Sequence, residues 1–216
     1  MKYSIMTFDL RNFRGKQQAQ SVRELLRWYD PDIVCIRNLE DRMLPELPFI
    51  TEAYRVYGGK AAGRRSIRSC ILYRKGMFEL ADGHTEILRT SPLRLPCVIT
   101  SGTLVNDSDR LYIVCAAANR PGGQKIAGVI LQNTADNMII CGDLDEIRFQ
   151  QTGLIDVRGI NRTVSGILRS AAPNYRPADR ILISEKLSLL HAEAVESLFM
   201  GVRPSGRIPV YCELEL

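Results

Sequence analysis

Short apolar runs rich in strand-forming residues recur along the whole chain. Several of them are almost continuously apolar, which is typical of strands that are covered on both faces. Between the first two runs the spacing changes, because apolar residues in Gln17–Tyr29 recur at helical period and predict an amphipathic helix that stops before Asp30-Pro31. The runs that predict strands are Tyr3–Phe8, Ile33–Ile36, Ser69–Tyr73, Cys97–Val105, Leu111–Ala116, Met138–Cys141, Ile181–Ser184 and Ile208–Leu216.

The order of these elements predicts an α/β protein. A second helix is predicted at Gly123–Thr134, ahead of the strand that begins at Met138, and the last part of the chain is richer in strand than in helix. Two sheets packed face to face, with helices outside, would satisfy this order. No repeat or Pro/Ser-rich linker divides the chain, so residues 1–216 are predicted to form a single domain.

Composition and charge narrow the class of protein. Hydrophobic residues make up 45% and charged residues 25%, which is ordinary for a globular protein. Asp9 and Arg11 come before any apolar segment of signal-peptide length could form, and no apolar stretch is long enough to predict a membrane span. The net charge of +5 permits an anionic partner such as nucleic acid or a phosphorylated ligand, but does not require one.

Six cysteines are spread through the chain, each in or beside an apolar run. They form no CxxC motif and no Cys/His cluster at metal-ligand spacing. We therefore expect buried, reduced thiols that pack as small hydrophobes. Together with the N-terminal pattern, this predicts a reducing compartment and a cytoplasmic protein. The cysteines are Cys35, Cys70, Cys97, Cys115, Cys141 and Cys212.

Four segments place polar residues where predicted strands begin or end. In order and spacing they resemble the motifs of the endonuclease/exonuclease/phosphatase superfamily, which includes exonuclease III and DNase I-like proteins. The resemblance implies a two-sheet, four-layer α/β sandwich with its site along one rim. The segments are Ile5–Arg11, Pro31–Asn38, Ile139–Asp145, and Ala178–Ser184 with Ser205–Val210.

The resemblance also implies a chemistry, hydrolysis of phosphate esters with a divalent metal, usually Mg²⁺. A Glu holds the metal, an Asn and an Asp position the water, and an Asp–His pair stabilises the developing charge. The chain departs from this pattern at most positions. Asp9 stands in place of the first-strand Asn, Arg37-Asn38 in place of Gln-Glu, and Asp145 in place of the Asn that follows Asp143.

The last motif departs furthest. Ser205-Gly206-Arg207 stands in place of Ser-Asp-His, and the mid-chain His is replaced by Ala117, or by Asn119 after a small shift. Arg207 could contact a phosphate but cannot exchange a proton near pH 7. These losses favour a catalytically degenerate protein, a pseudoenzyme that binds nucleic acid, a phosphorylated ligand or a protein partner, or serves as a scaffold.

An active metal-dependent phosphodiesterase or phosphatase is the alternative. The resemblance implies that four carboxylates converge on the rim, with Glu40 nearby, namely those of Asp9, Asp143, Asp145 and Asp179. Such oxygen-rich clusters suit Mg²⁺, Mn²⁺ or Ca²⁺. Asp143 would then be the base and Arg207 would supply charge to the transition state. The competing interpretation is a salt-bridge network in which Asp9 and Asp145 pair with Arg37 and Arg207. The candidate catalytic residues are Asp143, Asp145, Asp179 and Arg207, and the candidate metal ligands are Asp9, Asn38, Asp143 and, in the active alternative, Asp145.

Aromatic and basic residues leave two smaller questions open. The basic segment Lys60–Arg68 is flanked by Tyr54, Tyr57 and Tyr73. It could grip a nucleic-acid backbone beside aromatic platforms, or it could be a solvated loop. Trp28, near the end of the first predicted helix, is expected to pack.

Overall fold

The computed structural model describes most of the chain. The helix predicted at Gly123–Thr134 lies almost entirely outside the described residues, and so do Asn119, Asp145 and Arg207. The described residues are 1–11, 13, 15–60, 67–88, 97–117, 128, 137–144, 153–157, 179–205 and 208–216.

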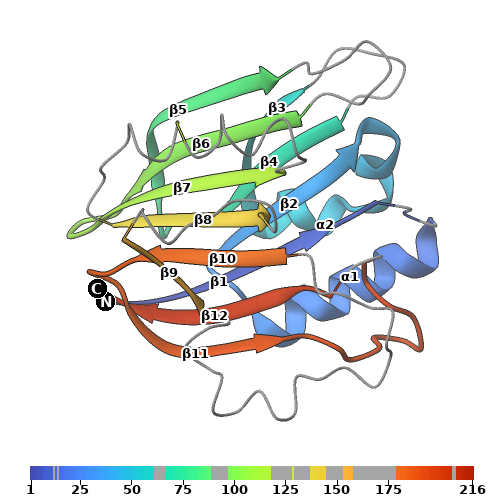
Figure 1. The fold of residues 1–216 in the computed structure, drawn as a ribbon. Helices are drawn as coiled ribbons and strands as arrows, with labels where there is room; N and C mark the ends of the chain where they lie inside the picture. Colours follow the sequence, from blue (N-terminus) through green and yellow to red (C-terminus); the bar gives the residue numbers. More distant parts are fainter. Residues whose placement is uncertain are drawn as a thin grey trace.

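Two mixed six-stranded sheets pack face to face (Figure 1). The first has the strand order β11-β12-β1-β2-β4-β3 and the second has the order β5-β6-β7-β8-β10-β9. The strands are β1 (Lys2–Asp9), β2 (Ile33–Glu40), β3 (Tyr54–Lys60), β4 (Ile67–Arg74), β5 (Glu79–Leu88), β6 (Cys97–Val105), β7 (Arg110–Ala117), β8 (Met138–Asp143), β9 (Leu154–Asp156), β10 (Asp179–Ser184), β11 (Ser188–Ala194) and β12 (Val210–Glu215).

The central core lies between the inner faces of the two sheets. Every second residue of β1 points inward, so Tyr3 and Ile5 meet Ile139 and Ile181 from the opposite sheet. The outer face of the second sheet is buried as well, around Ile140. Both faces of the central strands are therefore covered, which is why their sequences are almost continuously apolar.

Helices form a third layer on the outer face of the first sheet. Helix α1 (Lys16–Tyr29), the 3-10 helix η1 (Asp41–Glu46) and the short helix α2 (Pro48–Ala53) pack against β1, β2 and β4. The α1 helix ends as predicted, at Asp30, which has a left-handed φ of 45° and donates its backbone N–H to the Leu26 carbonyl. None of the helices that the structure describes is long and apolar enough to cross a membrane.

The eight strands predicted from apolar runs all form, with ends that differ by at most four residues. Four strands were not predicted: β3, β5, β9 and β11. They lie at the edges of the two sheets, where an exposed face removes the apolar signal. The basic segment Lys60–Arg68, for which a solvated loop was one interpretation, begins at the last residue of β3 and ends in β4.

The prediction that Trp28 packs is wrong, and two of the three candidate aromatic platforms are buried. Trp28 is 79% exposed and does not pack into the core, whereas its neighbour Tyr29 stacks against Tyr211 with ring centroids 4.9 Å apart. Tyr54 and Tyr73 are buried, and the Tyr54 hydroxyl donates to the Pro31 carbonyl at 2.8 Å. Neither tyrosine can serve as a platform for a base.

A tight turn before the last strand is strained. Phe199 and Val202 exchange both backbone hydrogen bonds around Met200 and Gly201, whose φ values are 54° and 72°. This geometry is that of a two-residue type I′ hairpin, which favours Asn-Gly. A methionine pays a steric cost in the left-handed region, and its side chain is largely exposed.

Replacing Met200 by asparagine is expected to raise the free energy of unfolding by about 0.5–1 kcal/mol. Asparagine tolerates the left-handed backbone, and little packing is lost because Met200 is exposed. Urea unfolding of the wild type and of the variant measures the difference. Met200→Leu is the matched control and should give no gain. An Asn variant no more stable than the Leu variant would refute the strain.

Candidate functional site

Polar residues from both sheets meet at one rim of the sandwich. Asp9, the last residue of β1, is the register partner of Arg37 on the parallel strand β2. Asp143 and Asp179 are register partners on the antiparallel strands β8 and β10. The final residues of β1, β2 and β8 and the first of β10 all lie on the right of Figure 1. The convergence implied by the resemblance is therefore present for Asp9, Asp143 and Asp179, whereas the fourth carboxylate, Asp145, lies outside the described residues.

A β-bulge in β2 follows Arg37, whose side chain points into the sandwich. Cys35 and Arg37 both lie on the inner face, and Asn38 is the extra residue between the pairs Arg37↔Ser69 and Leu39↔Arg68. Because of the bulge, Leu39 returns to the outer face and packs in the helix-covered core. Asn38 has a φ of 57°, in the left-handed region that asparagine tolerates better than most residues.

The Arg37 side chain lies between two buried carboxylates. Its Nη2 donates to Asp179 Oδ1, and its Nη1 lies 3.3 Å from Asp9 Oδ2, an ion-pair distance. Only 1% of Arg37 is exposed, and both aspartates are 0% exposed. Burial alone would lower the pKa of Arg37, but the charges of Asp179 and Asp9 more than offset this and raise it. Arg37 is therefore a permanent cation.

Asp9 is surrounded by further donors. Its Oδ1 accepts hydrogen bonds from Asn38 Nδ2 and from the Arg11 backbone N–H, each at 2.7 Å. The Arg11 guanidinium lies 3.3 Å from Oδ2 and is half-exposed at the rim. Ser205 anchors the strand end, since its hydroxyl donates to the Asp9 carbonyl.

These donors do not fit a divalent cation. Mg²⁺ requires oxygen ligands in near-octahedral array, whereas Asp9 faces guanidinium groups, an amide NH₂ and a backbone N–H. Among the residues that the structure describes, no group of three or more His, Cys, Asp or Glu side chains could hold a metal ion. The predicted pairing of Asp9 with Arg37 is confirmed, while Asp145 and Arg207 lie outside the described residues.

Two interactions of the ion-pair network around Arg37 were not predicted from the sequence. Asp179 was a catalytic candidate, yet it is the closest ion-pair partner of Arg37. Arg11 was not predicted to take part either, although its position two residues after Asp9 could have suggested it. Glu40 does not join the network and pairs with Arg42 at 2.6 Å. Asp143 is half-buried beside Asp179, and its charge acts on Arg37.

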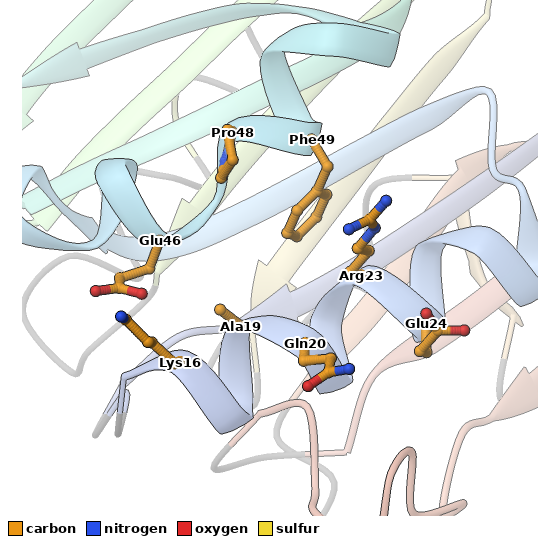
Figure 2. A pocket seen from close by; sticks show the side chains of 8 residues that line it. All are labelled: Lys16, Ala19, Gln20, Arg23, Glu24, Glu46, Pro48 and Phe49. Atoms are coloured by element: carbon orange, nitrogen blue, oxygen red, sulfur yellow. The ribbon is translucent and has the colours of Figure 1, made fainter.

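A separate pocket of about 280 Å³ opens between α1 and the η1–α2 segment (Figure 2). Phe49 points its ring toward α1, and the Arg23 guanidinium lies beside it. Charged residues of both signs surround the Phe49 ring. The pocket shares no residue with the ion-pair network of Asp9, Arg11, Arg37 and Asp179. It is lined by Lys16, Ala19, Gln20, Arg23, Glu24, Glu46, Pro48 and Phe49.

Comparisons with known proteins show the fold. No protein-family model matches the sequence, and no curated protein matches it. Solved structures do match. TDP2 from D. rerio, complexed with a single-strand DNA product, superposes with a TM-score of 0.76 at 17% identity, covering 100% of this chain and 99% of that one.

Two further structures agree. An endonuclease/exonuclease/phosphatase from Bacteroides vulgatus has a TM-score of 0.77 at 15% identity and covers 100% of this chain and 99% of its own. The human Nocturnin catalytic domain, with a bound sulfate anion, has a TM-score of 0.71 at 16% identity and covers 99% and 93%. The chain therefore has the DNase I-like α/β sandwich fold of the endonuclease/exonuclease/phosphatase superfamily.

Proposed function

We propose that this protein is a catalytically degenerate relative of the endonuclease/exonuclease/phosphatase enzymes and works as a binding or scaffold protein. The observation that carries the proposal is the buried Arg37 guanidinium between Asp9 and Asp179. It supplies positive charge at the strand ends where the resemblance implies a metal. That charge is fixed and enclosed by protein, so it cannot follow a reacting phosphate.

The chemistry that the resemblance implies needs groups that this rim does not offer. A metal lowers the pKa of water and polarises the phosphoryl oxygen, while Arg37 can do neither. Its pKa is raised further by its two carboxylate partners, so it cannot serve as an acid or a base near pH 7. Loss of a positioned acid–base group typically costs about 10²–10⁴ in rate.

The fold and the charge favour an anionic partner over an uncharged one. The solved TDP2 structure from D. rerio contains a single-strand DNA product, and the Nocturnin domain contains a sulfate anion. This chain carries a net charge of +5, and the half-exposed Arg11 lies at the rim. We propose nucleic acid or a phosphorylated ligand as the partner, and a protein partner as the second possibility.

Hydrolysis of a generic phosphodiester in millimolar Mg²⁺ or Mn²⁺ tests the proposal. We expect no turnover above the rate without protein, and no difference between the wild type and Asp143→Ala. Binding of a labelled single-stranded oligonucleotide, followed by fluorescence anisotropy at several salt concentrations, is the matching positive measurement. Affinity should fall as salt rises, because phosphate contacts release counterions. Turnover that Asp143→Ala abolishes would contradict the proposal.

An active metal-dependent phosphodiesterase or phosphatase is the second candidate. Asp143 favours it, because this carboxylate is only half-buried and sits at the rim beside Asp179. Mg²⁺ would be the expected cofactor of such an enzyme. The ion-pair network weighs against it, since Asp9 already has cationic partners.

We also propose that the protein is cytoplasmic and that residues 1–216 form one domain. All six cysteines are buried and none is in a disulfide, as expected from the sequence, and this supports a reducing compartment. Continuous pairing of β1 with β12 joins the two ends of the chain in one sheet, which supports a single domain.

A further inference from the structure

Thiols from both sheets meet in the centre of the sandwich. Cys35 on β2 faces Cys115 on β7 and Cys141 on β8, and each is 0% exposed. Cys115 and Cys141 are register partners on neighbouring parallel strands. Cys35 comes from the opposite sheet, and its thiol interacts with both of them, most strongly with Cys115. The three thiols thus belong to one buried cluster near Arg37, which lies two residues after Cys35 on β2.

Two contacts fix the position of the Cys115 sulfur. It accepts a hydrogen bond from the Ser69 hydroxyl at 3.1 Å, and it donates to the Ile36 carbonyl at 3.8 Å. Ser69 and Ile36 both belong to the first sheet, so the Cys115 sulfur reaches across the interface to the strand that carries Cys35. A disulfide requires the two Cβ atoms to lie about 3.5–4.5 Å apart, so such close cross-sheet packing is a precondition.

We propose that Cys35 and Cys115 form a redox-sensitive pair, which oxidation converts to a disulfide linking the two sheets directly beneath the Arg37 network. Cys115 is held near β2 by its contacts with Ser69 and Ile36, and the Cys35 thiol on β2 interacts with it. The link therefore forms across the sandwich and not between the neighbours Cys115 and Cys141.

A peroxide is the oxidant, and the step balances. One thiol loses its proton and attacks a peroxide oxygen, which breaks the O–O bond, gives a sulfenic acid and releases water. The second thiol then attacks the sulfenic sulfur, forms the S–S bond and releases a second water. The two sulfurs lose two electrons in total, and the peroxide takes them up.

Burial makes the pair slow to react. It raises the pKa of the Cys115 thiol, so little thiolate forms near neutral pH. The pair therefore stays reduced under the ordinary poise of a reducing compartment and responds to sustained oxidation that coincides with transient opening of the sandwich. Once formed, the buried bond is equally slow to be reduced.

The test is peroxide treatment of the folded, reduced full chain, followed by alkylation in denaturant and peptide mapping. We expect two thiols to be lost from alkylation and one linked pair of peptides, containing Cys35 and Cys115. The melting temperature should rise by at least about 5 °C and return after reduction, because the link closes a long loop of the unfolded chain.

Matched variants distinguish formation of the Cys35–Cys115 disulfide from unspecific oxidation of the cysteines. Cys70 is also fully buried, but it lies in the helix-covered core on the other face of the sheet. Cys70→Ser should form the link like the wild type, while Cys35→Ser and Cys115→Ser should not. The wild-type peptide map remains decisive if either of those two variants fails to fold. A Cys115–Cys141 link, scrambled links, or no link after prolonged oxidation would each overturn the proposal.

Discussion

Replacing Arg37 by methionine is expected to lower the free energy of unfolding by about 3–5 kcal/mol. Methionine fills much of the same volume but leaves two buried aspartates, Asp9 and Asp179, without their shared cation. Two like charges would then repel in a region from which water is excluded. Urea unfolding measures the loss, and a change below about 1 kcal/mol would contradict the account.

Two matched variants show whether the loss comes from charge. Arg42 pairs with Glu40 at the surface, where its side chain is 63% exposed, so Arg42→Met should leave stability unchanged within error. Adding Asp179→Asn to Arg37→Met removes one of the two carboxylates that lose Arg37 as their partner and should recover part of the lost stability. A double variant less stable than Arg37→Met would point to lost packing instead.

Replacing Gly142 by alanine is expected to cost more than about 4 kcal/mol and to prevent folding of most of the protein. A Cβ at this position would overlap the carbonyl oxygen of Ala116, its register partner on the neighbouring strand β7. The φ of Gly142 is 143°, which alanine rarely adopts, and the new methyl group would also crowd the Arg37 side chain.

Gly76→Ala is the control for that variant. Gly76 also has a positive φ, of 77°, but nothing lies within 4 Å of the position that a Cβ would take. Its replacement should cost only about 1 kcal/mol, the backbone strain alone. Circular dichroism and the soluble yield compare the two variants. Equal behaviour of Gly142→Ala and Gly76→Ala would show that the steric overlap does not decide the outcome.

The fold could be predicted from the sequence because the central strands are buried on both faces. Runs such as Ile33–Ile36 and Met138–Cys141 are apolar at every position, and the period of Gln17–Tyr29 marks the one long helix that the structure describes. The edge strand β5 gave no such signal, since most of its side chains are exposed. Trp28 shows the converse, because a large apolar residue on an amphipathic helix was expected to pack and does not.

The site could be predicted only as a set of strand ends. The resemblance identified Asp9, Arg37, Asp143 and Asp179 as neighbours, and complementary charge suggested that Asp9 pairs with Arg37. The dominant partner, Asp179, could not be chosen from the sequence. It lies 142 positions away and on the other sheet, so its distance to Arg37 depends on how the two sheets pack.

The network also explains why this set of charged rim residues is compatible with a stable fold. Changing the strand-end residues while keeping an isolated buried carboxylate would be strongly destabilising. Here a buried cation accompanies the two buried anions, and Asn38 donates to Asp9. The charges at these positions thus balance one another. This supports the proposal that Arg37 has taken over the electrostatic role of a metal.

The most direct test of this central claim is titration with Mg²⁺ and Mn²⁺, read as a thermal shift, on the wild type and on Arg37→Gln. We expect no saturable shift for the wild type, because Asp9 and Asp179 already have Arg37 as their cation. It predicts a saturable rise for Arg37→Gln, where a divalent ion can compensate Asp9 and Asp179. A wild type that is stabilised by metal as strongly as Arg37→Gln, and that loses this response in Asp143→Ala, would contradict the account.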